Sequence, residues 1–184
     1  MNPESFELQL TTEANSQAIR NLWPLYLHDI SEYDGNVANP HGVITPDDSI
    51  ETLGDAQLTP GSAWWTTPSQ LFPYLGTVDG RPAGFNLIAS GPYVPTPEID
   101  FVVYEFFLAK PYRGTSVAFE MARQGIARHP GTWEVVTYPN APQAIRFWRK
   151  ALPLCAQDGA VVETEEDHPF GRKVVFRFLV GSPA

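Results

Sequence analysis

EFFLAKPYRGTSVA, residues 105–118, is the segment from which the fold of this chain is best read. It completes an apolar and aromatic run, Ile99 to Ala109, whose Val, Tyr and Phe content favours a central strand over a helix. Beyond Arg113-Gly114 the spacing becomes helical, and His129-Pro130-Gly131 ends the helix. One narrow face of that helix carries the small or slender residues Ala118, Met121, Ala122 and Gly125. The segment predicts a strand, a tight turn and a helix packed closely on a sheet.

A helix that begins in such a turn is suited to bind phosphate. Its first turn leaves about four backbone N–H groups without partners and carries roughly half a unit of positive charge. A pyrophosphate fits this combination. We therefore expect the backbone amides of the Arg113–Ala118 bend to converge on a space for two linked phosphates.

Toward the amino terminus, apolar and polar residues alternate over Phe6–Leu10 and predict a strand. A helical region follows from Ser16, a candidate N-cap, and Pro24 within it predicts a kink or two short helices. Leu71–Val78 and Ala83–Ala89 flank Asp79-Gly80 and predict a hairpin with a two-residue type I′ turn. Apart from this hairpin, the proline-rich middle third predicts loops.

Toward the carboxyl terminus, strands are predicted at Trp133–Tyr138 and Lys173–Val180, with a further strand around Gly159–Glu163. Between the first two of these, Asn140–Leu152 predicts a helix that Pro153 ends. The expected order is β-α-α-β-β-β-α-β-α-β. We expect one domain, residues 1–184, because a chain of 184 residues is short for two independent cores.

The composition restricts partners and compartment. A net charge of -9 argues against nucleic acid and anionic membranes as partners, although many soluble proteins are acidic. The single cysteine, Cys155, cannot form an intrachain disulfide, which suits a reducing compartment. Neither a signal peptide nor an apolar stretch of roughly eighteen residues is visible, so we expect a cytoplasmic protein. The four histidines lack metal-binding spacing, and we expect no metal.

Two motifs resemble those of a known superfamily. Residues 113–118 resemble the pyrophosphate loop of the GNAT superfamily, the acyl-CoA-dependent N-acyltransferases, whose pattern is Arg/Gln-x-x-Gly-x-Gly/Ala. Arg113 and Ala118 match, while Ser116 stands where the first Gly is usual. NAPQAIRFW, residues 140–148, resembles the family's Asn-x-x-Ala-x-x-Phe-Tyr segment at the expected distance. Segments 105–107 (EFF), 130–135 (PGTWEV) and 147–149 (FWR) are similar to a bacterial branch of predicted GNAT acetyltransferases.

The resemblance implies the GNAT α/β fold, a mixed and mostly antiparallel sheet with helices on both faces, and acetyl-CoA as co-substrate. It implies that Asn140 bonds the pantetheine arm, a role compatible with capping the following helix. The residues that it implies for cofactor binding are Leu108, Arg113, Gly114, Thr115, Ser116, Val117, Ala118, Asn140, Phe147 and Trp148.

The resemblance also implies an N-acetyltransferase in which a small-molecule primary amine attacks acetyl-CoA directly in a ternary complex. Glu105 is the expected base and Asp100 the reserve, with a strand bulge deciding which face Glu105 takes. Backbone N–H groups near Leu108 are expected to stabilise the oxyanion. Trp148 replaces the Tyr that commonly protonates the leaving thiolate, which leaves Tyr138, Tyr104 or water. The departures at Ser116 and Trp148 keep a catalytically silent acyl-CoA-binding or sensor domain as the alternative.

The acceptor site is expected in the loops of residues 33–72, whose acidic residues hint at a cationic amine. His28 is either an acceptor-site residue or a surface histidine, and Trp64-Trp65 either lines an acceptor pocket or seals a loop against the core. An acyl-enzyme on Cys155 finds no support from a neighbouring His or carboxylate in the sequence. The last strand offers an edge on which a homodimer could form.

Overall fold

The computed structural model describes residues 5–181, which form a seven-stranded sheet of order β1-β2-β3-β4-β5-β7-β6. All neighbouring strands are antiparallel except β4 and β5, which are parallel. The strands are β1 (Phe6–Leu10), β2 (Leu71–Val78), β3 (Arg81–Ser90), β4 (Phe101–Leu108), β5 (Gly131–Thr137), β6 (Val161–His168) and β7 (Gly171–Val180). The predicted mixed, mostly antiparallel sheet is confirmed.

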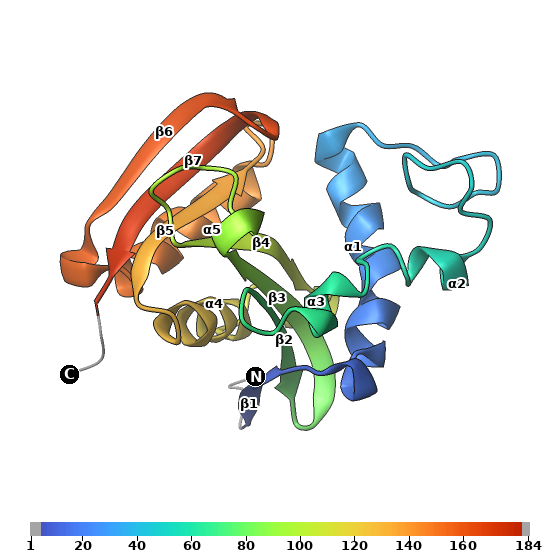
Figure 1. The fold of residues 1–184 in the computed structure, drawn as a ribbon, viewed down its shortest axis with the longest axis horizontal. Coiled ribbons are helices and arrows are strands. Elements are labelled where there is room, and N and C mark those ends of the chain that lie inside the picture. Colours follow the sequence, from blue (N-terminus) through green and yellow to red (C-terminus); the bar gives the residue numbers. More distant parts are fainter. Residues whose placement is uncertain (1–4, 182–184) are drawn as a thin grey trace.

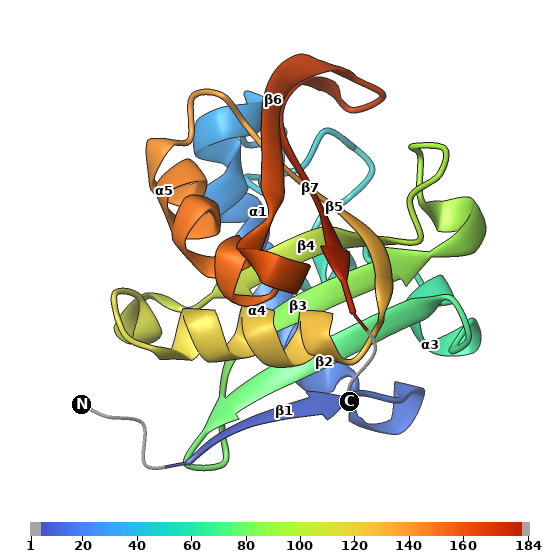
Figure 2. The ribbon, with the colours of Figure 1, turned by 90° about the vertical axis from the view of Figure 1, so that its left-hand side faces the viewer.

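Helices cover both faces of this sheet. They are α1 (Gln17–Asp34), α2 (Leu53–Ala56), α3 (Ala63–Thr66), α4 (Val117–Ala127) and α5 (Pro142–Ala151). Figure 1 shows α1 and α4 on opposite sides of β2, β3 and β4, and Figure 2 shows α4 crossing in front of these strands. One apolar cluster lies under α4 and α5, and a second one joins α1 and α3 to the other face.

Helix α1 continues through Pro24, so of the two predicted outcomes, a kink or two short helices, the division into two helices is wrong. Its buried face, which includes Ile19, Trp23 and Tyr26, packs on the sheet and outweighs the loss of one backbone hydrogen bond at the proline. Ser16 is the N-cap as predicted, but its hydroxyl donates to the carbonyl oxygen of Glu13 and accepts from the Arg20 side chain, not from a backbone N–H of the helix.

The hairpin and the close packing of α4 are confirmed. Asp79 and Gly80 both have positive φ, 50° and 72°, as a type I′ turn requires. Gly125 of α4 lies so close to β3 that a Cβ there would come within 2.5 Å of Asn86 Nδ2. The small residues of α4 thus set its distance from the sheet.

The carboxyl-terminal edge of the sheet corrects one expectation. The last strand, β7, is paired on both sides, with β5 and β6, so it offers no edge for a homodimer. The strand expected around Gly159–Glu163 runs longer, as β6, and forms the edge itself. Its charged residues include Glu163, Glu165 and Asp167, and charge of this kind discourages pairing with a second copy.

A bulge in β4 and an early end to its pairing with β5 shape the middle of the sheet. The β3–β4 register shifts so that Leu87 faces Glu105 and Ile88 faces Val103, which leaves Tyr104 as the extra residue. β4 pairs with β5 only over residues 101–103. Past Val103 the two parallel strands leave an opening between them. Among residues 5–181, no helix has both the length and the apolar character needed to cross a membrane.

Candidate active site

The opening between β4 and β5 leads into a cavity of about 900 Å³. Its walls come from the second half of α1, from β4 and β5, from the start of α4 and α5, and from the β6–β7 turn. Elements on both faces of the sheet therefore reach one space. This is possible because β4 and β5 stop pairing halfway along.

Glu105 faces this cavity because of the bulge. Val102 and Phe107 both belong to the apolar cluster under α1 although they are five residues apart, which regular alternation forbids. The extra residue, Tyr104, turns Glu105 to the α1 side, where Tyr26 donates its hydroxyl proton to the carboxylate. The parity of the strand alone would have given the opposite face.

The environment of Glu105 suits a general base. Burial raises the pKa of its carboxyl group to about 7, and the hydrogen bond from Tyr26 opposes this rise. Asp34 raises the same pKa further, while Lys173 lowers it. Burial, followed by the charge of Glu105, raises the pKa of Tyr26 well above its ordinary value, so Tyr26 stays a donor. A carboxyl group of pKa near 7 can accept a proton at neutral pH.

The bend from Arg113 to Ala118 presents free backbone donors. Gly114 takes the positive φ of 74°, and Ser116, the N-cap of α4, has a φ of -69° that any residue adopts. The hydroxyl of Thr115 pins the turn by donating to Tyr112 O and accepting from Val117 N. Within residues 5–181, the N–H groups of Gly114, Thr115, Ser116 and Ala118 donate to no protein acceptor. The bend therefore fits a phosphate, and Ser116 does not disturb it.

The side chain of Arg113 makes its contacts with β4 and α1, away from the backbone donors of the bend. Its Nε donates to Leu108 O at 2.7 Å, its Nη2 pairs with Asp29 of α1, and its Cζ lies 5.6 Å from the centre of the Phe107 ring. The guanidinium thus bridges β4 and α1 at the cavity wall. Direct phosphate binding by this side chain stays a prediction. It requires the guanidinium to give up its ion pair with Asp29 and to pair with the phosphate instead.

The backbone of Leu108 points into the opening. Ala109 N–H donates to Ala83 O at 2.8 Å, so Gly84 and Leu108 form the next, non-hydrogen-bonded pair of the antiparallel ladder. The N–H and C=O of Leu108 then point away from β3, and the C=O accepts from Arg113. Because β5 has already stopped pairing, the Leu108 N–H is available as an oxyanion donor.

Helix α5 supplies an aromatic wall. Phe147 and Trp148 line the cavity, and their rings lie 5.5 Å and 5.1 Å from the ring of Phe106, centre to centre. Asn140 is not the helix N-cap, which was the expected second role. The cap is Ala141, because Pro142 with its fixed φ occupies the first helical position. Asn140 Nδ2 instead lies 3.5 Å from Tyr33 O, outside the residues that line the cavity.

No family sequence model matches the chain, and no curated protein sequence matches it significantly. Solved structures do match. An acetyltransferase from Thermus thermophilus aligns with a TM-score of 0.63 at 14% identity, over 98% of this chain and 100% of that one. Aminoglycoside acetyltransferase AAC(6')-Ib, in complex with ribostamycin and coenzyme A, aligns with a TM-score of 0.64 at 18% identity, over 96% and 94%.

A further match, from Desulfovibrio desulfuricans, is described as an acetyltransferase of the GNAT family and has a TM-score of 0.55 at 14% identity, over 96% of this chain and 99% of that one. This chain has the GNAT fold. The alignments to these three structures each extend over nearly the whole of this chain. At these identities the likeness concerns the fold alone.

Within this GNAT fold, several sequence-based candidates lie away from the cavity. Asp100, the reserve base, lies at the exposed start of β4, and its pKa is lowered by hydrogen bonds from the backbone and hydroxyl of Thr132. Cys155 does not line the cavity, and burial raises the pKa of its thiol to about 11. Neither residue is placed to react with a substrate in this cavity.

The loop of residues 33–72 contributes less to the GNAT-fold cavity than expected, since only Tyr33 of this range lines it. The Asp47 carboxylate accepts from Ser49, and the Asp55 carboxylate accepts from the backbone N–H of Thr52, the N-cap of α2, so these carboxylates serve local turns. Trp64 packs on Tyr104 at 5.5 Å between ring centres, and Trp65 Nε1 donates to Thr11. The two tryptophans therefore seal α3 against the core.

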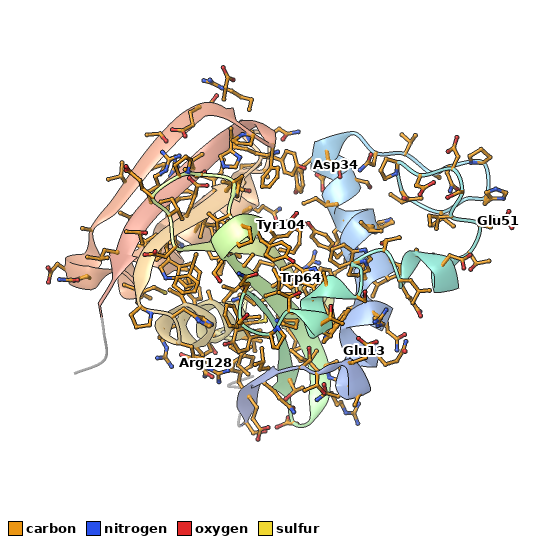
Figure 3. The ribbon with its side chains drawn as sticks, viewed as in Figure 1. Glu13, Asp34, Glu51, Trp64, Tyr104 and Arg128 are labelled. Atoms are coloured by element: carbon orange, nitrogen blue, oxygen red, sulfur yellow. The ribbon has the colours of Figure 1, made fainter. Side chains whose placement is uncertain are left out.

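The cavity also brings in residues that no sequence motif marked. Tyr26 and Lys173 line it, as does Phe170 of the β6–β7 turn. An aromatic hydroxyl on a buried helix face needs a partner, which is the signal that could have drawn attention to Tyr26. Figure 3 labels Asp34 at the end of α1 and Tyr104 on β4 beside this region.

His28 lines the rim with its side chain 67% exposed, 3.5 Å from Asp29. Among residues 5–181, no three His, Cys, Asp or Glu side chains are grouped to hold a metal.

Proposed function

We propose that the protein is an N-acetyltransferase that moves the acetyl group of acetyl-CoA to the primary amine of a small acceptor while both substrates are bound. The observation that carries this proposal is the position of Glu105 in the same opening as the free amides of Leu108 and of the Gly114–Ala118 bend. The GNAT fold and its coenzyme A-bound structural neighbours support it.

The chain's own groups suffice to bind acetyl-CoA. The bend at Gly114–Ala118 offers its amides and the positive end of α4 to the pyrophosphate. Phe147 and Trp148 form an apolar wall along the opening, and Leu108 N–H points into it. When bound, acetyl-CoA supplies the activated acetyl group as a thioester.

Acetyl transfer requires the amine to lose a proton and the thioester carbon–sulfur bond to break. Glu105 accepts the proton of the ammonium, so that the nitrogen lone pair can form a bond to the acetyl carbon. Leu108 N–H donates to the acetyl oxygen as it gains negative charge. The sulfur leaves with the bonding electrons, and the nitrogen gives up its second proton to the departing thiolate or to solvent. Since a thiol has a pKa of about 8–9, the sulfur can depart without a dedicated acid. The absence of a Tyr at Trp148 is therefore compatible with turnover.

A spectrophotometric assay of thiol release from acetyl-CoA, with a panel of primary amines, tests the proposal. We expect Glu105→Gln to lower kcat/KM by about 10²- to 10⁴-fold. The matched control is Glu7→Gln, since Glu7 is exposed on β1 and should leave the rate unchanged. If Glu105→Gln keeps full activity at every pH, the base is another group.

A catalytically silent acyl-CoA-binding domain is the second candidate. It is favoured by Trp148, which has no acidic hydroxyl, and by the ion pair that occupies Arg113. Calorimetry with coenzyme A separates the possibilities. Binding without thiol release across the amine panel would establish the silent domain. If coenzyme A gives no heat and no thermal protection, both candidates fail.

A further inference from the structure

Lys173 is a buried cation that faces the cavity and, among residues 5–181, contacts an aromatic ring but no anionic partner. It lies near the start of β7, is 6% exposed and lines the cavity. Among residues 5–181, its Nζ takes part in no hydrogen bond and no ion pair. Its nearest described partner is the ring of Tyr138, whose centre lies 3.3 Å from Nζ. A lysine buried to this degree is normally paired, so its partner should come from a ligand.

The acids nearest to Lys173 along the sheet are engaged elsewhere. Glu166 lies directly opposite Lys173 in the β6–β7 register, yet its carboxylate is held by Arg177 and Thr164. Glu134, on the same face of β5, is bound by Arg177 and His168. Arg177 thus satisfies both carboxylates and leaves Lys173 free to face the cavity.

Two further acids face Lys173 from the other elements around the cavity. Asp34, at the end of α1, accepts from the backbone and side chain of Asn36, both at 2.8 Å, and Glu105 of β4 accepts from Tyr26. Neither forms an ion pair with Lys173. Burial lowers the pKa of Lys173, while the charges of Asp34 and Glu105 raise it. An arriving anion would join this ammonium without breaking an existing salt bridge.

Lys173 lies on the α1 side of the opening, the side that Glu105 also faces. Val174 and Phe176 belong to the cluster under α4 and α5, so Lys173, which alternates with them, faces α1. Tyr138 faces α1 as well, since its ring stacks on Tyr33 with centres 6.5 Å apart. Glu105 shares this side through its contact with Tyr26. The phosphate-binding bend instead opens α4, the helix that Figure 1 places across the sheet from α1.

We infer that the acceptor carries an anionic group, such as a carboxylate, besides its amine, and that Lys173 binds this group while Glu105 receives the amine proton. The inference rests on the proposed function. It assigns the substrate to the class of amino acids and similar small zwitterions. The acidic residues that hinted at a cationic acceptor, among them Asp47, Asp48 and Asp55, do not line the cavity.

Matched acceptor pairs test this inference. Each pair consists of an amino acid, for example phenylalanine, and its primary amide, which keeps the amine but lacks the carboxylate. We expect wild-type protein to prefer the acid, although the amine of the amide loses its proton more readily. Lys173→Met should raise KM for the acid by about 10- to 100-fold, the effect of losing one charge-assisted hydrogen bond, and leave KM for the amide unchanged. Lys173→Arg should keep the preference.

The controls separate recognition from other roles. Lys150→Met, on the exposed surface of α5, should change neither KM. A higher dissociation constant for coenzyme A in Lys173→Met would assign the ammonium to the cofactor and overturn the inference. An equal fall of kcat for both acceptors would assign it to catalysis and also overturn it.

Failure of the inference and failure of the proposed function give different results. If wild-type protein acetylates acid and amide equally well, the inference is wrong and the proposed function stands. If no amine in the panel leads to release of thiol from acetyl-CoA, calorimetry of the amino acid with protein loaded with coenzyme A still tests the inference. Binding that Lys173→Met abolishes supports the inference, and absence of binding overturns it.

Discussion

Glu105 owes its basicity to opposing contacts, and Tyr26 controls one of them. Burial raises the pKa of the carboxyl group to about 7, and the Tyr26 hydroxyl lowers it by bonding the ionised form. The proposed base is the ionised form of Glu105, so under the proposed function the rate should rise with pH through the pKa of Glu105. Removing the hydroxyl in Tyr26→Phe should move this rise to higher pH. Activity at pH 6 should then fall more than activity at pH 9.

The pH dependence of kcat/KM measures this shift. Tyr93→Phe is the matched control, because Tyr93 lies outside the cavity lining and should leave the profile in place. The amine of the acceptor also titrates, so the profile of Glu105→Gln gives the contribution that is independent of the carboxylate. A rise at the same pH in Tyr26→Phe and wild type would show that Tyr26 does not tune the base.

Ser116 shows how a motif can lose a glycine and keep its geometry. The positive φ of the bend falls on Gly114, at 74°, and a Cβ there would meet no atom within 4 Å. Ser116 has an ordinary helical φ and still offers its N–H. The residue in which glycine is conformationally required thus lies two positions before the one at which the family pattern usually has it.

At the level of elements, the end of β4 is held in place by a glycine on β3. A Cβ on Gly84 would lie 2.2 Å from the backbone oxygen of Phe107 and 3.0 Å from Leu108 Cα. Because backbone atoms cannot rotate aside, Gly84→Ala must push the two strands apart. We expect the free energy of unfolding to fall by about 1–3 kcal/mol. The displaced Leu108 N–H should lower kcat as well.

Urea denaturation and the thiol-release assay check both effects. The matched control is Gly54→Ala in α2, where the added Cβ would make an ordinary contact of 3.4 Å with Thr52 Oγ1. A Gly→Ala change in a helix stabilises by roughly 0.5–1 kcal/mol. Equal changes in unfolding free energy and in kcat for the two substitutions would mean that β4 can move away from a Cβ at position 84 without cost.

The elements that could be predicted from the sequence are those with local signals. Asp79-Gly80 has the chemistry of a type I′ turn, and the small residues of α4 imply close packing. Helix ends were harder to predict from the sequence. The N-cap of α5 is Ala141 and not Asn140, because Pro142 occupies the first helical position, and α1 continues through Pro24 because its buried face packs on the sheet. In both cases a nearby proline or tertiary packing outweighed the local pattern.

The candidate site was predictable only where it is contiguous in sequence. Glu105 and the Gly114–Ala118 bend lie within one short segment, so their proximity followed from order alone. Lys173 reaches the cavity from β7, and Tyr26 from α1, through strand pairing and helix packing that no short motif encodes. The bulge at Tyr104, which depends on β3–β4 pairing, decides the face of Glu105.

On the scale of the whole molecule, a buried cluster of charged side chains links the strands of the sheet that lie far from α1. Glu134 is fully buried, and its carboxylate accepts from Thr96 at 2.7 Å and from Arg177 Nε at 2.9 Å. It also accepts from His168 Nε2 at 2.9 Å when the imidazole carries its proton on Nε2. Arg177 also binds Glu166. The cluster joins β5, β6 and β7 to the segment that precedes β4, and through β5 and β7 it supports Tyr138 and Lys173.

Removal of Arg177 should therefore destabilise the whole fold. Arg177→Met leaves the buried charge of Glu134 without its cation, which typically costs about 3–5 kcal/mol. Arg149→Met is the control, since Arg149 pairs with Glu163 on the surface and such pairs contribute about 0–1 kcal/mol. Urea midpoints measure the difference. Similar midpoints for the two variants would show that the cluster does not hold the sheet together.

The same comparison has a pH dependence of known sign. Hydrogen bonds from Arg177 and Thr164 lower the pKa of Glu166 to about 2 in the folded state. A depressed pKa stabilises the fold above the ordinary pKa of a glutamate, and this contribution disappears as the pH falls from about 4.3 toward 2. Arg177→Met loses most of the contribution at every pH. The difference in stability between Arg177→Met and the wild type should therefore narrow by the Glu166 contribution as acid is added. A difference that stays constant from pH 7 to pH 3 would assign the whole effect of Arg177 to contacts other than Glu166.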